Sequence, residues 1–543
     1  MTVNEKTSLL LQPQLVQDDT ASAAAAAANE RLPWGAGGDP AAAAVDVDLD
    51  IALDELPIIT RTNSFSLASP SFQVATHHMK VFDYEDEPEP VALDELKKLL
   101  TLVFPVVATY VLEYLPGLIC IMLVGHIDSP ESKEYVDAAT LSTMFTNVSS
   151  LSVGFGLSSA LDTLCSQAYG AGRLQKIGLY LQSALLVVGS CLVPIFVLNW
   201  HAGTFLRLLG QDPEVARLAG EFSRVTVFGV PFLFVYEMCR KLLQAQNITG
   251  PLVLIMICGN VVNISSGYYL AYHTPLGFHG AALSRTLGYM TLPVLLVPYF
   301  ALSPSYQQWW PGWDLRAAWR HTGVFLRLGV PGMLMMMMEW WAYEILGVMA
   351  GLLPDGVVAI SAHAVLMNVA SSLYMIYLGI AVSGNIRVGN ALGANCPRRA
   401  QLISRLTMAI VFALACGLAG LVFVFRRAIP SWLMRDQAAI DRAAECLLVM
   451  VPYEVVDAIN CVTQGIFRGT GRQNLAAKTN AFAFYGVGIP VAAVLAFYCR
   501  VGVEGLWIGF MAGIFTAYST CTIILYHSSW PQMAKEAQER TAH

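Results

Sequence analysis

Apolar stretches of about 20 residues recur along this chain from about Leu99 to Tyr526. A helix of that length crosses a hydrocarbon core of about 30 Å. Twelve such stretches are present, and they begin near Leu99, Asp137, Lys176, Glu221, Pro251, Gly280, Gly323, Val357, Leu402, Ala443, Ala476 and Val503. The pattern predicts an all-α membrane protein of about twelve transmembrane helices.

The composition supports this fold class. Hydrophobic residues make up 55% of the 543 residues and charged residues only 13%, whereas soluble domains have roughly 45–50% apolar and about 25% charged residues. A soluble core is a poor place for so much apolar sequence, so we expect the lipid bilayer to surround most of the chain.

The first 96 residues differ from the rest of the chain. They carry 17 acidic and 4 basic side chains, so their net charge is −13, and they contain an alanine run at Ala23–Ala28 and an acidic string at Asp83–Glu89. Such a segment buries little apolar surface, and we expect residues 1–96 to be a disordered, acidic, cytosolic tail. A short cytosolic tail is expected at residues 531–543. The N-terminal tail also contains an ExxxLL string, Glu5–Leu10, of the kind that endosomal and vacuolar sorting signals use.

Several chemistries lack their usual sequence patterns. The eleven cysteines include no close pair, and neither a GxxxxGK[ST] phosphate loop nor an HExxH zinc helix occurs. We therefore expect no cofactor and no metal site, and neither an ATP-driven pump nor a zinc protease. A transporter with this sequence would have to use an ion gradient, of protons or alternatively of Na⁺.

Basic residues alternate between the predicted loops. The richer loops hold Arg173, Lys176, Arg240, Lys241, Arg316, Arg320, Arg398, Arg399, Arg468 and Arg472, whereas Ala271–His279 and Leu352–Gly356 contain no Lys or Arg. Because basic loops stay on the cytosolic side, both termini are expected in the cytosol.

The chain also resembles itself. The residues Ala168–Ala171 match Ala391–Ala394 at an offset of 223, and Phe104–Pro105 match Val330–Pro331 at an offset of 226. Two further pairs fall between these offsets: Asp212 with Asp436, and Gly277–Gly280 with Gly502–Gly505. We predict two six-helix lobes, residues 97–313 and 314–530, related as a parallel internal repeat with the transport path between them.

Ionisable side chains inside a spanning helix are costly, so each should face protein or a wet cavity. The seventh span places Glu339, Trp340 and Glu344 beside a run of methionines. Carboxylates, indoles and methionines together suit the binding of varied cations. The two glutamates lie five residues apart and should not point the same way, so one would line a cavity and the other would brace a neighbouring helix.

The tenth span carries a polar stripe, because Glu454, Asp457, Asn460 and Gln464 are three, three and four residues apart. We expect this stripe to line a water-filled wall. Further candidates are Asn368 and Tyr374 on span eight, Asn147 on span two and Glu113 on span one.

Other polar residues have plainer explanations. Glu113 could instead reach the surface from near a helix end. We interpret His363 as a packing residue, Asp162 as a helix-end or gate contact, and Gly469–Gly471 as a tight turn without a phosphate-binding role.

Several short sequence strings in this chain resemble the eukaryotic multidrug and toxic compound extrusion (MATE) family. The resemblance rests on Ser152–Ala160 followed by Asp162–Leu164 and Gln167, on Glu339–Glu344, and on Arg387–Ala394, with Gly125–His126 and Arg468–Gly471 in agreement. It covers about Lys97 to Trp530. It implies twelve helices in two lobes, a central cleft, and exchange of a cation for a proton or Na⁺ by alternating access.

Carried over residue by residue, the family's span-seven glutamates are Glu339 and Glu344, and its span-ten carboxylate is Asp457. Two positions depart from the pattern. The span-eight carboxylate of animal members is Asn368 here, and the span-one aspartate of many prokaryotic members falls on Cys120. A proton site in the first lobe is therefore open, and Glu113 is the candidate substitute.

The sequence favours a proton-coupled exporter of organic cations, xenobiotics or related metabolites. Two alternatives stay open: an exporter or flippase of anionic or lipid-linked substrates, which should have a basic cleft, and a membrane-embedded enzyme, for which no catalytic cluster is visible. We expect a monomer that binds small organic molecules and no nucleic acid, in the plasma membrane or a vacuolar or endosomal membrane.

Overall fold

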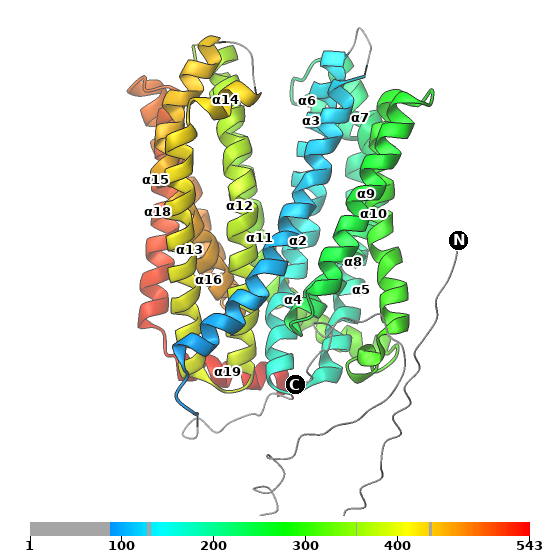
Figure 1. Cartoon of the computed structure of the whole chain (residues 1–543), viewed down its shortest axis with the longest axis vertical. Helices are drawn as coiled ribbons and strands as arrows, with labels where there is room; N and C mark the ends of the chain where they lie inside the picture. The colour runs from blue at the N-terminus through cyan, green and yellow to red at the C-terminus, as the bar shows by residue number, and fades with distance from the viewer. Residues whose placement is uncertain (1–86, 128–131, 355, 434–436, 543) are drawn as a thin grey trace, which may run out of the picture. The chain divides into compact units, whose positions relative to one another are not determined.

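The computed structural model describes residues 87–127, 132–354, 356–433 and 437–542. The chain divides into two units, Met1–Ser69 and Pro70–His543, and every described residue lies in the second. Regular structure in these ranges is helical throughout, and none of it is a β-strand (Figure 1). Residues 1–86 of the expected tail, with the ExxxLL string, and Asp436 of the repeat lie outside the described residues.

The first half of this unit runs from α2 to α10. Its helices are α2 (Ala92–Gly125), α3 (Ser132–Thr146), α4 (Ser152–Gly170), α5 (Leu174–Trp200), α6 (Ala202–Leu208), α7 (Pro213–Thr226), α8 (Val230–Ala245), α9 (Gly250–Tyr272) and α10 (Gly277–Leu302). A π-helical turn, Asn147–Leu151, joins α3 to α4, and a 3-10 turn, Val227–Gly229, joins α7 to α8.

The second half follows the same order. Its helices are α11 (Leu315–Gly351), α12 (Gly356–Gly393), α13 (Pro397–Phe425), α14 (Ala428–Leu433), α15 (Gln437–Thr470), α16 (Gln473–Ala481), α17 (Ile489–Ala493) and α18 (Val503–His527), and α19 (Trp530–Ala542) follows them. The π-helical turns Phe482–Gly488 and Val494–Tyr498 make α16 and α17 parts of one long span.

Eleven spans in the described residues are long and apolar enough to cross a membrane. The twelfth is α11, a continuous helix of 37 residues whose apolar sequence includes Glu339, Glu344 and the three aromatic residues between them. Each helical span begins at its predicted start or up to eight residues before it. The all-α, twelve-helix prediction is confirmed.

The internal repeat is visible in two equivalent turns. Gly170 ends α4 and Gly393 ends α12. After Gly170 the backbone N–H groups of residues 171, 172 and 173 donate to the carbonyls of residues 167, 169 and 168, and the same three bonds recur 223 residues later. The third residue of each turn has a positive φ, 69° at Gly172 and 59° at Asn395. The parallel repeat is therefore confirmed at the level of hydrogen bonds.

The two lobes also contact each other in reciprocal pairs. A Cβ on Gly156 of α4 would lie 2.5 Å from Cα of Met333, and a Cβ on Gly379 of α12 would lie 2.6 Å from Cα of Val107. Met333 is 226 residues after Val107, and Gly379 is 223 residues after Gly156. Contacts repeated in this way arise when two similar bodies pack about a pseudo-two-fold axis.

One end of this unit holds the start of α2 and all of α19 (Figure 1), and we call it the terminal end. Here Glu87 is buried, and its carboxylate accepts hydrogen bonds from the backbone N–H groups of Arg398 (3.0 Å) and Arg399 (2.8 Å) in the first turn of α13. An anion is stabilised at a helix N-terminus. Glu95 pairs with Arg387 and with Arg399. Residues 87–96, expected in the disordered tail, are thus part of the folded unit.

The expected C-terminal tail forms helix α19, which contacts both lobes. Arg173 of the first lobe donates to the carbonyl of Gln538 (3.1 Å) and to Oγ1 of Thr541 (2.9 Å). On the other side Gln538 donates to the carbonyl of Gly393. Buried apolar residues of α19, such as Met533, pack in one core with α12, α13 and α15. This segment is therefore docked along its length.

Candidate functional site

Three carboxylic side chains gather inside the second lobe. Glu339 comes from α11, and Glu454 and Asp457 come from neighbouring turns of α15, which packs along α12. Their exposed fractions are 6%, 0% and 1%, so water reaches none of them directly. The structure thus brings together Glu339 and Asp457, the two carboxyls that the sequence placed on the seventh and tenth spans.

Asp457 interacts electrostatically with both of the other carboxyls. Asp457 is close enough to feel the charge of Glu339, and Glu454 that of Asp457. Asp457 Oδ1 and both oxygens of Glu454 have no hydrogen-bond partner among the described residues. The hydroxyl of Tyr377 lies beside Glu454 without reaching hydrogen-bond geometry. Because unpaired buried acceptors are costly, this cluster needs a proton or another donor from outside the chain.

One buried cation faces the cluster. Arg468, near the end of α15, is 7% exposed and acts electrostatically on Glu339 and on Tyr374. Its backbone carbonyl accepts a hydrogen bond from Thr163 of α4, in the other lobe, at 2.5 Å. Arg468 therefore connects the carboxyl cluster to the contact between the lobes.

Aromatic side chains also lie close to the carboxyl cluster. The hydroxyls of Tyr343 and Tyr453 contact each other, and the ring of Tyr453 lies edge-on to Trp507, with centroids 5.1 Å apart. His363 packs 5.6 Å from the same indole and is buried. The interpretation of His363 as a packing residue is confirmed.

The polar stripe of α15 does not line a water-filled wall, and that prediction was wrong. All four members are at most 4% exposed. Gln464 donates to Asn480 Oδ1 of α16 at 2.7 Å and to Asn460 Oδ1 at 3.4 Å. The spacing correctly placed these residues on one face, but that face is covered by protein.

The other candidates lie apart from the cluster. Glu344 is half-buried, and no hydrogen bond or ion pair joins it to another described residue, so it braces no neighbouring helix. Trp340 packs against the core of the first lobe. Asn368 is exposed, and its side chain donates to the carbonyl of Ala364 on its own helix. Asn147 begins the π-helical turn before α4 and is half-buried.

Gly469–Gly471 is a turn, as expected. Gly469 and Thr470 end α15, and Gly471 follows with a positive φ of 76°.

Glu113 belongs to a buried charge cluster in the first lobe that the sequence did not reveal. Its carboxylate pairs with Arg240 of α8 at 2.6 Å, and Arg240 also pairs with Glu237. Lys241 pairs with Asp162 of α4 at 2.9 Å and with Glu237 at 3.4 Å. Asp162 is therefore an ion-pair partner inside the lobe, where we had expected a helix-end or gate contact.

Arg240 and Lys241 had been assigned to a cytosolic loop, and the structure corrects this. Both lie in α8 and are only 1% and 6% exposed. The spacing of Glu237 from these two residues, three and four positions, was the available signal, because such pairs meet on one helix face.

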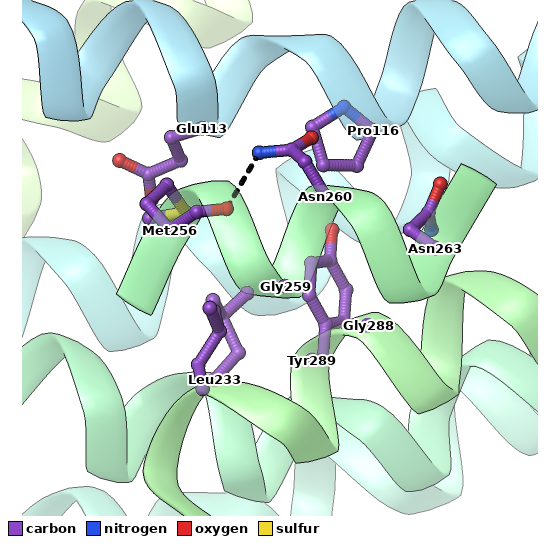
Figure 2. Close-up of a pocket in the computed structure, with 10 residues that line it drawn as sticks. Glu113, Pro116, Leu233, Met256, Gly259, Asn260, Asn263, Gly288 and Tyr289 are labelled. Atoms are coloured by element: carbon purple, nitrogen blue, oxygen red, sulfur yellow. Dashed lines mark hydrogen bonds between the residues drawn. The ribbon is translucent and has the colours of Figure 1, made fainter. Parts of the chain in front are cut away.

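A small cavity lies beside Glu113. It is lined by Glu113, Pro116, Leu233, Met256, Gly259, Asn260, Asn263, Gly288, Tyr289 and Leu292, and Figure 2 shows Glu113 from α2 and Leu233 from α8 facing it. Its volume is about 20 Å³, which suits about one water molecule. Asn260 donates to the carbonyls of Leu112 and Met256, both at 2.9 Å.

Comparison with known proteins shows where this architecture occurs. The MatE family model matches residues 105–269 and again 331–494, one match in each lobe. Multidrug and toxin extrusion protein 2 of Oryctolagus cuniculus is 34% identical over 448 residues, covering 82% of this chain and 73% of that protein. Multidrug and toxin extrusion protein 1 of Homo sapiens is 32% identical over 446 residues, covering 82% and 77%.

A solved structure agrees with the sequence comparison. The eukaryotic MATE transporter AtDTX14 superposes with a TM-score of 0.79 and 29% identity, covering 83% of this chain and 99% of that one. The matches in both lobes, the relatives and the fold agree, and the chain belongs to the MatE family of multi-pass membrane transporters, not enzymes.

Proposed function

We propose that this protein exports organic cations, including xenobiotics, in exchange for protons, and that Glu339 and Asp457 carry the exchange. The observation that carries the proposal is the buried carboxyl cluster of α11 and α15 with its unpaired oxygens. The names of the relatives, multidrug and toxin extrusion proteins, support the substrate class.

The exchange follows from mutual exclusion. Burial disfavours a charged carboxylate, so an empty cluster takes up protons. A bound organic cation stabilises the ionised form and expels a proton, and proton entry from the other side of the membrane then releases the cation. Uphill export then needs only that the carboxyl cluster opens alternately to one side of the membrane and to the other.

Arg468 would set the balance between these states. Its guanidinium acts on Glu339, so it favours the ionised form of that carboxyl and competes with the substrate cation. Because its backbone carbonyl is bonded to Thr163 in the other lobe, a change in how the lobes pack would move Arg468 relative to Glu339. Access and protonation are coupled in this proposal through that residue.

Neighbouring aromatic rings supply the remaining binding energy. Tyr343 and Tyr374 lie within electrostatic reach of Glu339. Cations bind to aromatic faces with about 0.5–2 kcal/mol of stabilisation, which tolerates varied shapes and suits a broad range of substrates.

The test is flux into or out of proteoliposomes under an imposed pH gradient, with an imposed Na⁺ gradient as a separate arm. Glu339→Gln keeps size and hydrogen bonding but removes the titratable charge, so it should abolish uphill transport of a cation. Glu339→Asp should retain some. Glu344→Gln is the matched control on the same helix, because Glu344 has no charged partner, and it should transport normally.

Normal pH-driven export by Glu339→Gln would refute the coupling role. Drive by the Na⁺ gradient alone would keep the site but replace the coupling ion. Transport of an anion in place of a cation would favour the alternative exporter of anionic or lipid-linked substrates.

We further propose that the terminal end faces the cytosol and that the protein acts as a monomer. At that end Arg173 and Arg472 directly precede α5 and α16, and Arg398 and Arg399 lie in the first turn of α13. This fits the preference of basic residues for the cytosolic side. Impermeant thiol labelling of a cysteine added after His543, in sealed cells of known orientation, decides the first point. The plasma membrane and the vacuolar or endosomal membranes stay alternatives, which a fluorescent fusion would separate.

A further inference from the structure

We propose that Arg240 is a tethered cation that permanently occupies the first lobe's counterpart of the exchange site. The first lobe would then hold Glu113 ionised and take no part in proton exchange. The inference rests on the proposed function of Glu339 and Asp457, but its own test does not depend on it.

Glu113 is the repeat counterpart of Glu339. The two matches to the family model begin at residues 105 and 331, an offset of 226, and Pro105 and Pro331 lie inside α2 and α11. Glu113 and Glu339 each lie eight residues after that proline. The reciprocal contact of Val107 and Met333 fixes the same register in space.

Helices α8 and α15 correspond in the same way. Each ends in a turn with a positive φ, at Asn247 (61°) and at Gly471 (76°), an offset of 224. The N–H groups of Asn247 and Gly471 donate to Gln244 and Arg468, at equivalent positions. At this offset Leu233 corresponds to Asp457, and Arg240 corresponds to Gln464.

The cavity of Figure 2 lies where these equivalences meet. Glu113 and Leu233 both line it, just as Glu339 and Asp457 act on each other in the second lobe. The first lobe therefore has Leu233 at the position where the second lobe has the carboxyl of Asp457. The remaining volume of about 20 Å³ admits a water molecule and no organic cation.

Arg240 receives the contacts that a bound organic cation would need. Its guanidinium pairs with Glu113 at 2.6 Å and lies 4.5 Å from the centre of the Tyr110 ring. Carboxylate and aromatic face together are a usual cation site. Arg240 is 1% exposed and covalently attached, so transport cannot carry it away.

The surrounding charges keep this arrangement nearly neutral. The charged groups facing Arg240 are Glu113 from α2, Glu237 and Lys241 from α8, and Asp162 from α4 through Lys241. Tyr110 and Tyr236 are the other titratable neighbours, and Asn260 and Tyr289 face the cavity from α9 and α10. Three acids against two bases leave one net negative charge, so removing Arg240 leaves two.

The experiment compares the infrared spectra of the full-length wild type and its variants in lipid. The C=O stretch of protonated carboxyls is the signal that is followed. Wild type and Glu113→Gln should show the same protonated-carboxyl signal, because Glu113 is already ionised. Arg240→Ala should gain a signal that the double variant Glu113→Gln/Arg240→Ala lacks. Arg240→Lys, which keeps the charge, should resemble wild type.

Chemical rescue sharpens the test. Guanidinium ion fits the space vacated in Arg240→Ala and should remove the new signal, whereas urea, its neutral isostere, should not. Loss of signal in Glu113→Gln alone, or an Arg240→Ala signal that persists in the double variant, would overturn the proposal. If Arg240→Ala fails to fold, the Glu113→Gln comparison still decides.

The two proposals fail in different ways. If Glu339→Gln loses no protonated-carboxyl signal at any pH, Glu339 is not the coupling acid, and the conclusion about Arg240 is untouched. If Glu113→Gln loses that signal, the first lobe holds a proton and only the tethered-cation inference fails.

Discussion

The pair Asp162–Lys241 offers a quantitative test of the buried charge cluster. Nζ of Lys241 lies 2.9 and 3.0 Å from the two carboxylate oxygens, and the two side chains are 3% and 6% exposed. At 2.9 Å two unit charges attract by roughly 6 kcal/mol with an effective dielectric constant of about 20. Desolvation offsets part of this, and removing one partner of such a pair costs about 3–5 kcal/mol.

Asp162→Asn should therefore lower the free energy of unfolding by about 3–5 kcal/mol, because Lys241 keeps only its longer contact with Glu237. The double variant Asp162→Asn/Lys241→Met should recover most of that loss, so its cost should be well below the sum of the costs of Asp162→Asn and Lys241→Met. Glu237 still pairs with Arg240 in the double variant. Unfolding by denaturant in detergent micelles, applied to the wild type, the two single variants and the double variant, measures these free energies.

The exposed pair Arg217–Glu221 is the control. Its atoms are equally close, 2.7 Å apart, but its side chains are 44% and 30% exposed, so Glu221→Gln should cost about 1 kcal/mol or less. If Asp162→Asn costs no more than this control, or if the double-mutant cycle shows no coupling, the cluster is not the buried network described above.

Four further outcomes are expected. Truncation after Ser529 removes α19, which forms hydrogen bonds with both lobes. It should speed maleimide labelling of a cysteine placed at Ala391, which is buried in the core that α19 covers. Unchanged labelling would contradict the bridging role of α19. Glu87→Ala should cost about 1 kcal/mol by removing the cap of α13, whereas deletion of residues 1–86 should leave transport intact, as flux and unfolding together would show. Gly156→Val should impair folding severely, since its Cβ would meet the backbone of α11 at 2.5 Å, and normal expression of that variant would refute the close approach.

The sequence alone determined the membrane class, the helices and the repeat. These follow from local properties: a stretch of about 20 apolar residues is long enough to span a bilayer wherever it occurs. The same reasoning identified Glu339 and Asp457 as candidates, because an ionisable carboxyl in such a stretch is costly and indicates a functional site.

Only the tertiary structure decided which charges meet. Arg240 and Lys241 are adjacent in the sequence and resemble a basic loop, but acids from α2 and α4 surround them. The stripe on α15 faces protein, and α16 contacts it at Gln464. Glu87 is held by the first turn of α13, and α19 by contacts with both lobes. A sequence fixes how much charge a helix carries, whereas the rotation of its neighbours fixes whether that charge is neutralised, and this difference separates Glu113 from Glu339.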